Sequence, residues 1–260
     1  MTLRKPDSWI AETGPFDIIG DVHGCARELE KLLEKLGYRV KTRGPRGARR
    51  TRLSHKDNRK IIFVGDLVDR GPWSMDVLRL AMQAEEDGIA LCVIGNHDDK
   101  FLRWLKGRDV TINKSLQTSI DESRNEKPKF LEEARHYLES LPSHLILDEG
   151  RLIVAHAGLP ERYHGIESRT SRAFAMFGET TGQTDDLGFP VRLDWARNYT
   201  GQAVVVHGHV AGRKVRHKNN VWCLDTGCCY GGKLTALRWP EQDIVQVKAK
   251  KTWFEHPRFS

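Results

Sequence analysis

The chain has 260 residues, of which 39% are hydrophobic and 30% are charged, and its formal net charge is +7. This composition is too apolar for a disordered chain and too polar for a membrane protein, and no apolar run approaches the about 18 residues that a spanning helix needs. The segment 39–60 holds ten Lys or Arg and one acid, so the rest of the chain is mildly acidic, which argues against general coating of nucleic acid.

The N-terminus and the cysteines indicate the compartment. No apolar stretch with a small-residue cleavage site opens the chain, so we expect no secretory signal and a cytoplasmic protein. None of the five cysteines forms a C-x-x-C pair, which argues against zinc-finger and thioredoxin-type sites. We expect the adjacent Cys228 and Cys229 to be reduced, partly buried thiols.

The first half of the chain alternates between short apolar runs and helical patterns. The patterns predict strands at 16–20, 60–65 and 89–95, helices at 26–36 and 74–87, and a polar helical stretch at 98–142. Ser74 is expected to cap the second helix. Each strand ends in glycine and polar residues, which is typical of an α/β sheet with sites at the carboxyl ends of its strands.

The second half is rich in strand patterns, at 145–147, 152–155, 203–206, 221–224, 234–237 and 244–247. Segment 178–190 is expected to be a loop, and segment 39–60 a basic loop insert. No repeat or low-complexity linker divides the chain, and the candidate ligands described next come from both halves. We therefore expect residues 1–260 to form a single domain.

Polar residues gather where five of these strands end. The sets are Gly20-Asp21-Val22-His23-Gly24, Gly65-Asp66-Leu67-Val68-Asp69-Arg70-Gly71, Gly95-Asn96-His97-Asp98, Ala155-His156-Ala157-Gly158 and His207-Gly208-His209. One set alone would be an ordinary turn. Five such sets at one edge of a sheet would bury carboxylates that have no neighbouring positive charge, and bound cations can neutralise them. Mixed oxygen and imidazole ligands suit Mn²⁺, Fe, Ni²⁺, Zn²⁺ or Co²⁺, and a bridged pair about 3.5–4 Å apart suits phosphoryl chemistry.

These motifs together resemble the calcineurin-like metallophosphoesterases over about residues 15–240. Within that family the chain is similar to the branch of serine/threonine phosphoprotein phosphatases and symmetrical diadenosine-tetraphosphate hydrolases. Segments 194–201 and 224–237 also resemble the phosphatase module of bacterial polynucleotide kinase–phosphatases. The resemblance implies an α/β (four-layer α+β) fold, an αββα sandwich. Relatives often read Gly-His-Thr-Pro at the last histidine, whereas Val210 and Ala211 follow it here.

The resemblance implies two divalent metal ions, with Mn²⁺ favoured and Fe, Ni, Co or Zn as alternatives. Asp21 and His23 would hold the first, Asp66 would bridge both, and Asn96, His156 and His209 would hold the second. His207 competes with His209, because residues two apart on an extended chain point to the same side. Spacing leaves that choice open, and the Gly-His pattern of the family favours His209.

The remaining roles also follow from the resemblance. Arg70 would grip the phosphate, since its planar guanidinium matches two phosphate oxygens. His97 would be the general acid, and Asp69 would orient its imidazole. Asp98 is the alternative orienting residue. Asp225 would lie beside the first metal or the phosphate, or else simply begin a turn. A metal-bound hydroxide would attack phosphorus directly, without a phosphoenzyme.

We therefore expect a phosphoesterase acting on nucleotide-type phosphates, with dinucleoside tetraphosphates favoured. The alternatives are a nucleic-acid end-processing phosphatase or phosphodiesterase, a serine/threonine phosphoprotein phosphatase, and a non-catalytic phosphate-binding regulator. The basic segment 39–60 is either a solvated insert or a local contact for nucleic acid or polyphosphate. No membrane partner is expected.

Overall fold

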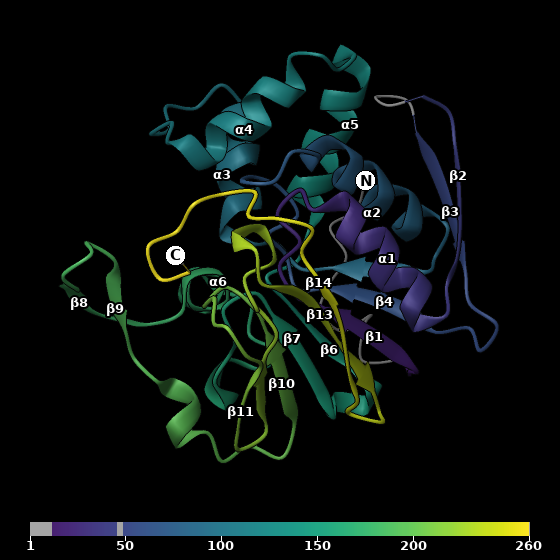
Figure 1. Cartoon of the computed structure of the whole chain (residues 1–260). Helices are drawn as coiled ribbons and strands as arrows, with labels where there is room; N and C mark the ends of the chain where they lie inside the picture. The colour runs from purple at the N-terminus through teal and green to yellow at the C-terminus, as the bar shows by residue number, and fades with distance from the viewer. Residues whose placement is uncertain (1–11, 46–48, 260) are drawn as a thin grey trace.

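The computed structural model describes residues 12–45 and 49–259. Arg46 of the basic segment and the N-terminal residues 1–11, on which the expectation of no secretory signal depends, lie outside the described residues. Two five-stranded sheets pack face to face, with helices on their outer sides (Figure 1). This architecture confirms the expected αββα sandwich.

In the first sheet, the carboxyl ends of three parallel strands lie side by side at one edge. Its spatial order is β14 (Ile244–Lys248), β13 (Lys233–Trp239), β1 (Phe16–Ile19), β4 (Lys60–Phe63) and β5 (Ala90–Cys92). β1, β4 and β5 are parallel, and Ile19, Phe63 and Cys92 are aligned in register. The polar segments that follow these strands therefore begin at the same edge.

The second sheet supplies the other half of that edge. Its order is β11 (Arg216–Lys218), β12 (Val221–Cys223), β10 (Val204–His207), β7 (Leu152–Ala155) and β6 (His144–Leu147). The central strands β7, β10 and β12 are parallel. His156, His209 and Asp225 each follow the end of one of them.

The side chains of β4 alternate between the two hydrophobic cores on either side of the first sheet. Ile62 and Val64 belong to the core between the two sheets, together with Val154. Ile61 and Phe63 belong to the core between the first sheet and its helices. Because successive side chains point to opposite faces of a strand, a continuous apolar run here serves two cores at once.

The helices lie largely where the sequence predicts them. They are α1 (Ala26–Leu36), α2 (Ser74–Glu86), α3 (Asn96–Leu105), α4 (Lys114–Ser123), α5 (Pro128–Ser140) and α6 (Arg169–Phe177). α1 ends because Gly37 adopts a left-handed φ of 102°. α6 covers the outer face of the second sheet. In the described part of the chain, no helix has both the length and the apolar character to cross a membrane.

Two segments expected to be loops form hairpins instead. β2 (Arg39–Arg43) pairs with β3 (Arg50–Ser54), and β8 (Thr180–Thr184) pairs with β9 (Pro190–Arg192). In the first, buried Thr51 and Leu53 alternate with exposed residues and pack the hairpin against α1 and α2. The high charge of the segment hides this weak alternation in the sequence.

The expected cap of α2 is also corrected. The helix begins at Ser74 itself, and Trp73 precedes it as the capping residue without a side-chain cap. The Ser74 hydroxyl instead accepts a hydrogen bond from the backbone N–H of Asp69, at 3.1 Å. Ser74 therefore stabilises the turn after β4.

Candidate metal centre and active site

Sharp turns after the strands bring the polar side chains together. Five residues of these turns have left-handed backbone conformations: His23 (φ 43°), Asp66 (φ 50°), Asp69 (φ 74°), Arg70 (φ 70°) and His209 (φ 66°). Such conformations cost non-glycine residues energy and gather where a site requires them. Their concentration at the strand ends marks this edge as the functional site.

Two glycines permit the close approach of the carboxylates. A Cβ at Gly95 would collide with the backbone N and the Oδ1 of Asp66. A Cβ at Gly208 would collide with Oδ1 of Asp21. The backbone of one turn therefore forms the wall against which the carboxylate of another turn rests.

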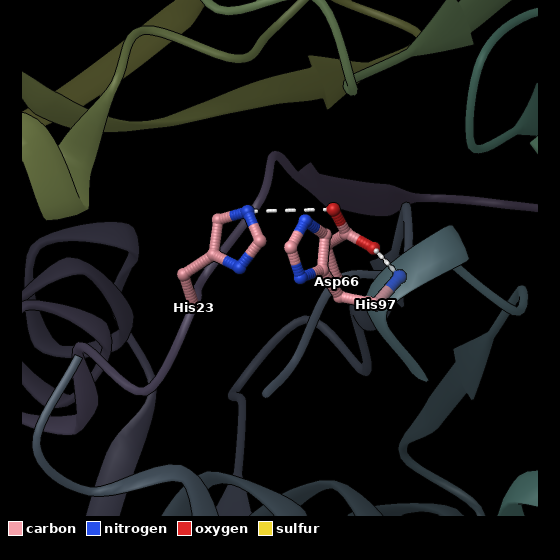
Figure 2. A group of neighbouring side chains, drawn as sticks. All are labelled: His23, Asp66 and His97. Atoms are coloured by element: carbon pink, nitrogen blue, oxygen red, sulfur yellow. Dashed lines mark hydrogen bonds and ion pairs between the residues drawn. The ribbon is translucent and has the colours of Figure 1, made fainter. Parts of the chain in front are cut away.

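Asp66 lies between two histidines from different sheets. Its Oδ2 is 3.3 Å from Nε2 of His23, and its Oδ1 is 3.4 Å from Nε2 of His156. Figure 2 shows His23 on one side of this carboxylate and the backbone N–H of His97 donating to its Oδ1, at 2.9 Å. One carboxylate thus offers an oxygen to each of two neighbouring ligand groups, as a bridging ligand would.

The second ligand group contains all four residues predicted for it. Ligand atoms of Asp66, His156 and His209 lie within 4.8 Å of one another. Nε2 of His156 is also 3.0 Å from Oδ1 of Asn96 and 3.1 Å from Nδ1 of His209. Carboxylate, amide and imidazole donors therefore converge on one point.

The first ligand group is arranged differently from the prediction. His23, Asp66 and His97 have ligand atoms within 4.8 Å of one another. Asp21 stands further out, with Oδ2 at 4.0 Å from Nε2 of His23. Its two oxygens accept the backbone N–H of His209, at 3.1 and 3.0 Å. The structure therefore places Asp21 beside the group but joins it to the last histidine turn.

Hydrogen bonds orient the ligand histidines. Nδ1 of His23 lies 2.8 Å from the carbonyl oxygen of Val68, and Nδ1 of His156 lies 2.9 Å from that of Val64. An Nδ1–H donated to a carbonyl leaves the Nε2 lone pair free for a cation. In His209 it is Nδ1 that faces the second group, whereas its buried Nε2 has no hydrogen-bond partner within the described residues.

Burial dominates the protonation of the site. It raises the pKa of Asp66 to about 7 and lowers that of His156 to about 4. Burial, with the nearby charges of Asp225 and Asp66, also raises the pKa of Asp21 well above its usual value. Burial thus disfavours the charged forms of these carboxylates and of the imidazole, and a divalent cation would restore the ionised carboxylates while it binds the neutral imidazoles.

The geometry distinguishes His209 from His207. His207 belongs to neither ligand group; its Nδ1 lies 2.9 Å from the carbonyl oxygen of Gly208, and its ring lies 6.0 Å from that of Trp195. Because His209 has a left-handed φ of 66°, the chain is not extended at this point, and the two side chains do not share one side as they would on a strand.

His97 and Asp69 form a pair beside the first group. Nδ1 of His97 is 2.6 Å from Oδ2 of Asp69, and the hydroxyl of Ser119 donates to Oδ1 of Asp69, at 2.6 Å. Burial raises the pKa of Asp69 to about 6. Asp98 is not placed to orient His97, because its carboxylate accepts the backbone N–H groups of Leu67 and Gly95, at 2.9 and 3.0 Å.

Arg70 lies against two histidines of the first group. Its guanidinium contacts Nε2 of His23 and lies 2.8 Å from Nε2 of His97. Its Cζ is 5.2 Å from the ring of Tyr230, a buried residue that sequence reasoning missed. The sequence around Tyr230 carries no signal for this contact, since the ring reaches Arg70 only through tertiary folding.

Asp225 and the cysteines complete the surroundings. Oδ1 of Asp225 accepts the N–H of Gly227, at 3.0 Å, so Asp225 forms a turn as well as lying near Asp21. All five cysteines are buried and free of disulfides. The carbonyl oxygen of Cys229 accepts the N–H groups of Trp253 and Phe254, both at 2.9 Å, which ties the C-terminal segment to the site.

Comparisons with known proteins agree with this geometry. A family described as Calcineurin-like phosphoesterase matches residues 14–245. Proteins described as bis(5'-nucleosyl)-tetraphosphatase PrpE, with the qualifier asymmetrical, are 40% identical in Oceanobacillus iheyensis and 38% identical in Bacillus subtilis. These matches cover 91% and 92% of this chain and 93% and 97% of the relatives, respectively.

Solved structures give the same result for the fold. The crystal structure of a protein provisionally described as a diadenosine tetraphosphatase is 29% identical, with a TM-score of 0.66 over 91% of this chain and 94% of that one. A serine/threonine phosphatase from Saccharomyces cerevisiae is 16% identical, with a TM-score of 0.58 over 95% of this chain and 82% of that one, and supports the fold alone.

Proposed function

The chain belongs to the calcineurin-like phosphoesterase family of metal-dependent hydrolases acting on phosphoric ester or anhydride bonds, and from this we propose that it cleaves dinucleoside tetraphosphates. Relatives that are 40% identical along nearly their whole length carry that activity in their names. The observation that carries the proposal is Asp66, whose two oxygens face histidines that follow strands of two different sheets.

We propose that two divalent cations bind here, with Mn²⁺ preferred. Asp21, His23 and Asp66 would hold one of them, and Asp66, Asn96, His156 and His209 the other. Mn²⁺ accepts imidazole beside carboxylate and amide oxygens, whereas Mg²⁺ favours octahedral oxygen ligands. When bound, such a pair polarises a phosphate and makes a water nucleophilic at neutral pH.

The protein's own residues would bind the phosphate and move the proton. Arg70 would offer two N–H groups to phosphate oxygens, which would replace the rings of His23 and His97 as partners of its guanidinium. His97 would protonate the leaving oxygen, since it lies next to Arg70 and therefore next to the bound phosphate. The carboxylate of Asp69 would favour the charged imidazole and hold it in place. Asp225 would face the substrate or the first cation from the β12 side.

The position of cleavage differs between the named relatives and the sequence resemblance. The resemblance pointed to symmetrical hydrolases, whereas the names of the relatives specify asymmetrical cleavage. We follow the relatives and propose that diadenosine tetraphosphate is cut into ATP and AMP. Symmetrical cleavage would release two ADP instead.

A substrate panel tests this function. Chelated protein is reloaded with Mn²⁺ and offered diadenosine tetraphosphate, a phosphopeptide and RNA with 2′- or 3′-phosphate ends, and the products are separated by ion exchange. We expect ATP and AMP from the first substrate and slower turnover of the others. Faster turnover of the phosphopeptide or the RNA would replace this proposal with the corresponding alternative. Strong activity in excess EDTA, or in Asp66→Asn, would contradict the role of the cations.

The basic segment is best treated as a separate surface. We propose that any contact of residues 39–60 with nucleic acid or polyphosphate is made by the β2–β3 hairpin rather than by the site. The cytoplasmic location and the single domain over residues 1–260 stay predictions.

A further inference from the structure

The nine cations of segment 39–60 that lie in the described part of the chain fall into two sets. Four of them pair with acidic residues, as Arg49 with Glu30 and Asp76, Lys56 with Asp57, Arg59 with Asp17 and Glu241, and Lys60 with Glu12. Five others, Arg39, Lys41, Arg43, Arg50 and Arg52, are exposed and form no ion pair with any residue that the structure describes. The fold therefore accounts for the first set and leaves the second unexplained.

The five unexplained cations share the outer face of the β2–β3 hairpin. Buried Thr51 and Leu53 occupy the opposite face, which packs on α1 and α2. Figure 1 shows the hairpin on the outer side of these helices, and the five cations on its outer face are exposed to solvent. The face belongs to the surface of the molecule rather than to the site at the strand ends.

The register sets like charges directly opposite one another. Lys41 faces Arg52, and Arg43 faces Arg50. Directly opposed like charges destabilise a strand pair, so this arrangement weakens the hairpin on its own. An external polyanion would remove that repulsion.

We propose that this face binds the phosphate backbone of nucleic acid. Alternate residues of a strand lie about 6.8 Å apart and facing strands about 5 Å apart. The facing pairs therefore repeat about every 6.8 Å and average about one cation per 3.4 Å, which matches the density of charge along one DNA strand. Four of the five cations are arginine, whose fork matches phosphate oxygens.

The same face predicts binding that is independent of base sequence. None of the outward-facing residues of β2 and β3 is aromatic, so the face offers no ring on which a base could stack. It also lacks the apolar side chains that anchor a protein in a lipid surface. Without base stacking or apolar anchoring, the face can make only contacts with phosphates. A nucleic-acid backbone is bound by such contacts alone, and we therefore favour nucleic acid over a membrane.

Salt-dependent binding of a fluorescent oligothymidylate of about 20 nucleotides tests the proposal. Single-stranded binding weakens with a slope of log K against log salt of about −0.7 per phosphate contact, so five contacts predict about −3.5. Arg43→Gln, Arg50→Gln and Arg52→Gln combined should reduce the slope to about −1.4 and the affinity by at least about tenfold at 50 mM salt. The matched control, Arg108→Gln, Arg124→Gln and Lys129→Gln, removes the same charge from exposed sites elsewhere and should bind like wild type.

Two results would overturn the proposal. One is equal binding by the hairpin variant and the control variant, which would reduce the effect to net charge. The other is binding to phosphatidylserine vesicles without binding to the oligonucleotide, which would assign the face to a membrane. Thermal melting followed by circular dichroism checks folding, and we expect the hairpin variant to melt no lower than wild type because two repulsive pairs are gone. Its turnover of p-nitrophenyl phosphate should be unchanged.

Discussion

His97 is the residue whose role depends most on the nature of the substrate. If it protonates the leaving oxygen, His97→Ala should slow phosphomonoesters with poor leaving groups by about 10²- to 10⁴-fold. Substrates with good leaving groups need little protonation and should lose much less. Comparing kcat for an alkyl phosphate and for p-nitrophenyl phosphate measures the difference. An equal loss on both substrates would show that His97 acts through the cations, which its place in the first ligand group allows.

Tyr230 positions Arg70 through the face of its ring. A cation–π contact contributes about 0.5–2 kcal/mol, so Tyr230→Leu should raise KM about 2- to 30-fold with a smaller change in kcat. Tyr230→Phe keeps the ring and should restore the wild-type KM. If the phenylalanine variant is as impaired as the leucine variant, the ring contact is not what matters.

The sequence identified functional residues that belong to a recognisable motif, but not those whose role depends on a tertiary contact. The strand-end motifs pointed to Asp66, His156 and His209, which the structure brings together. The spacing did not distinguish His207 from His209, because the deciding feature is a backbone angle, and only the Gly-His pattern of the family favoured His209. Tyr230 was missed because its partner lies 160 residues earlier in the chain.

At the scale of elements, Asp98 joins the turn after β4 to the start of α3. Asp98→Ala would leave the buried N–H groups of Leu67 and Gly95 without partners. Each such group costs about 1–3 kcal/mol, so the free energy of unfolding in urea should fall by about 2–5 kcal/mol. Asp99→Ala on the same helix is the matched control and should change it by less than about 0.5 kcal/mol. Similar losses in both variants would contradict this account of Asp98.

The parallel strands and their helices were predictable because long apolar runs and helical periodicity both favour them. The two hairpins were not. β2 carries a single aliphatic residue, Val40, among charged and polar ones, and all five residues of β8 are exposed. Such strands depend on pairing and on one packed face, which local sequence does not reveal.

At the scale of the whole molecule, the site exists only when the two sheets are assembled, because each sheet supplies part of the ligand set. The family resemblance, confirmed over residues 14–245, implied this architecture, whereas periodicity alone indicated only an α/β sheet. The depth at which the carboxylates are buried could not be read from the sequence. The depth of burial matters because it raises the pKa of the carboxylates, and this pKa links cation binding to the stability of the fold.

Stabilisation by Mn²⁺ should therefore increase with pH. In the chelated protein, Asp66 has a pKa of about 7, raised by burial above its unfolded value, so stability is lost as pH rises through 7. Bound cations remove that loss because they require the ionised carboxylate. The difference in Tm between Mn²⁺-loaded and chelated protein should grow between pH 6 and pH 8, reaching about 5–10 °C at saturating metal. A constant or shrinking difference in a thermal-shift titration would contradict the linkage.

We expect Asp66 to bridge two cations, one beside His23 of the first sheet and one beside His156 and His209 of the second sheet. Anomalous diffraction from crystals soaked in Mn²⁺ tests it most directly. We predict two peaks about 3.5–4 Å apart, one on each side of the Asp66 carboxylate, the first beside His23 and the second beside His156 and His209. A single peak, or a pair that does not share Asp66, would contradict the account.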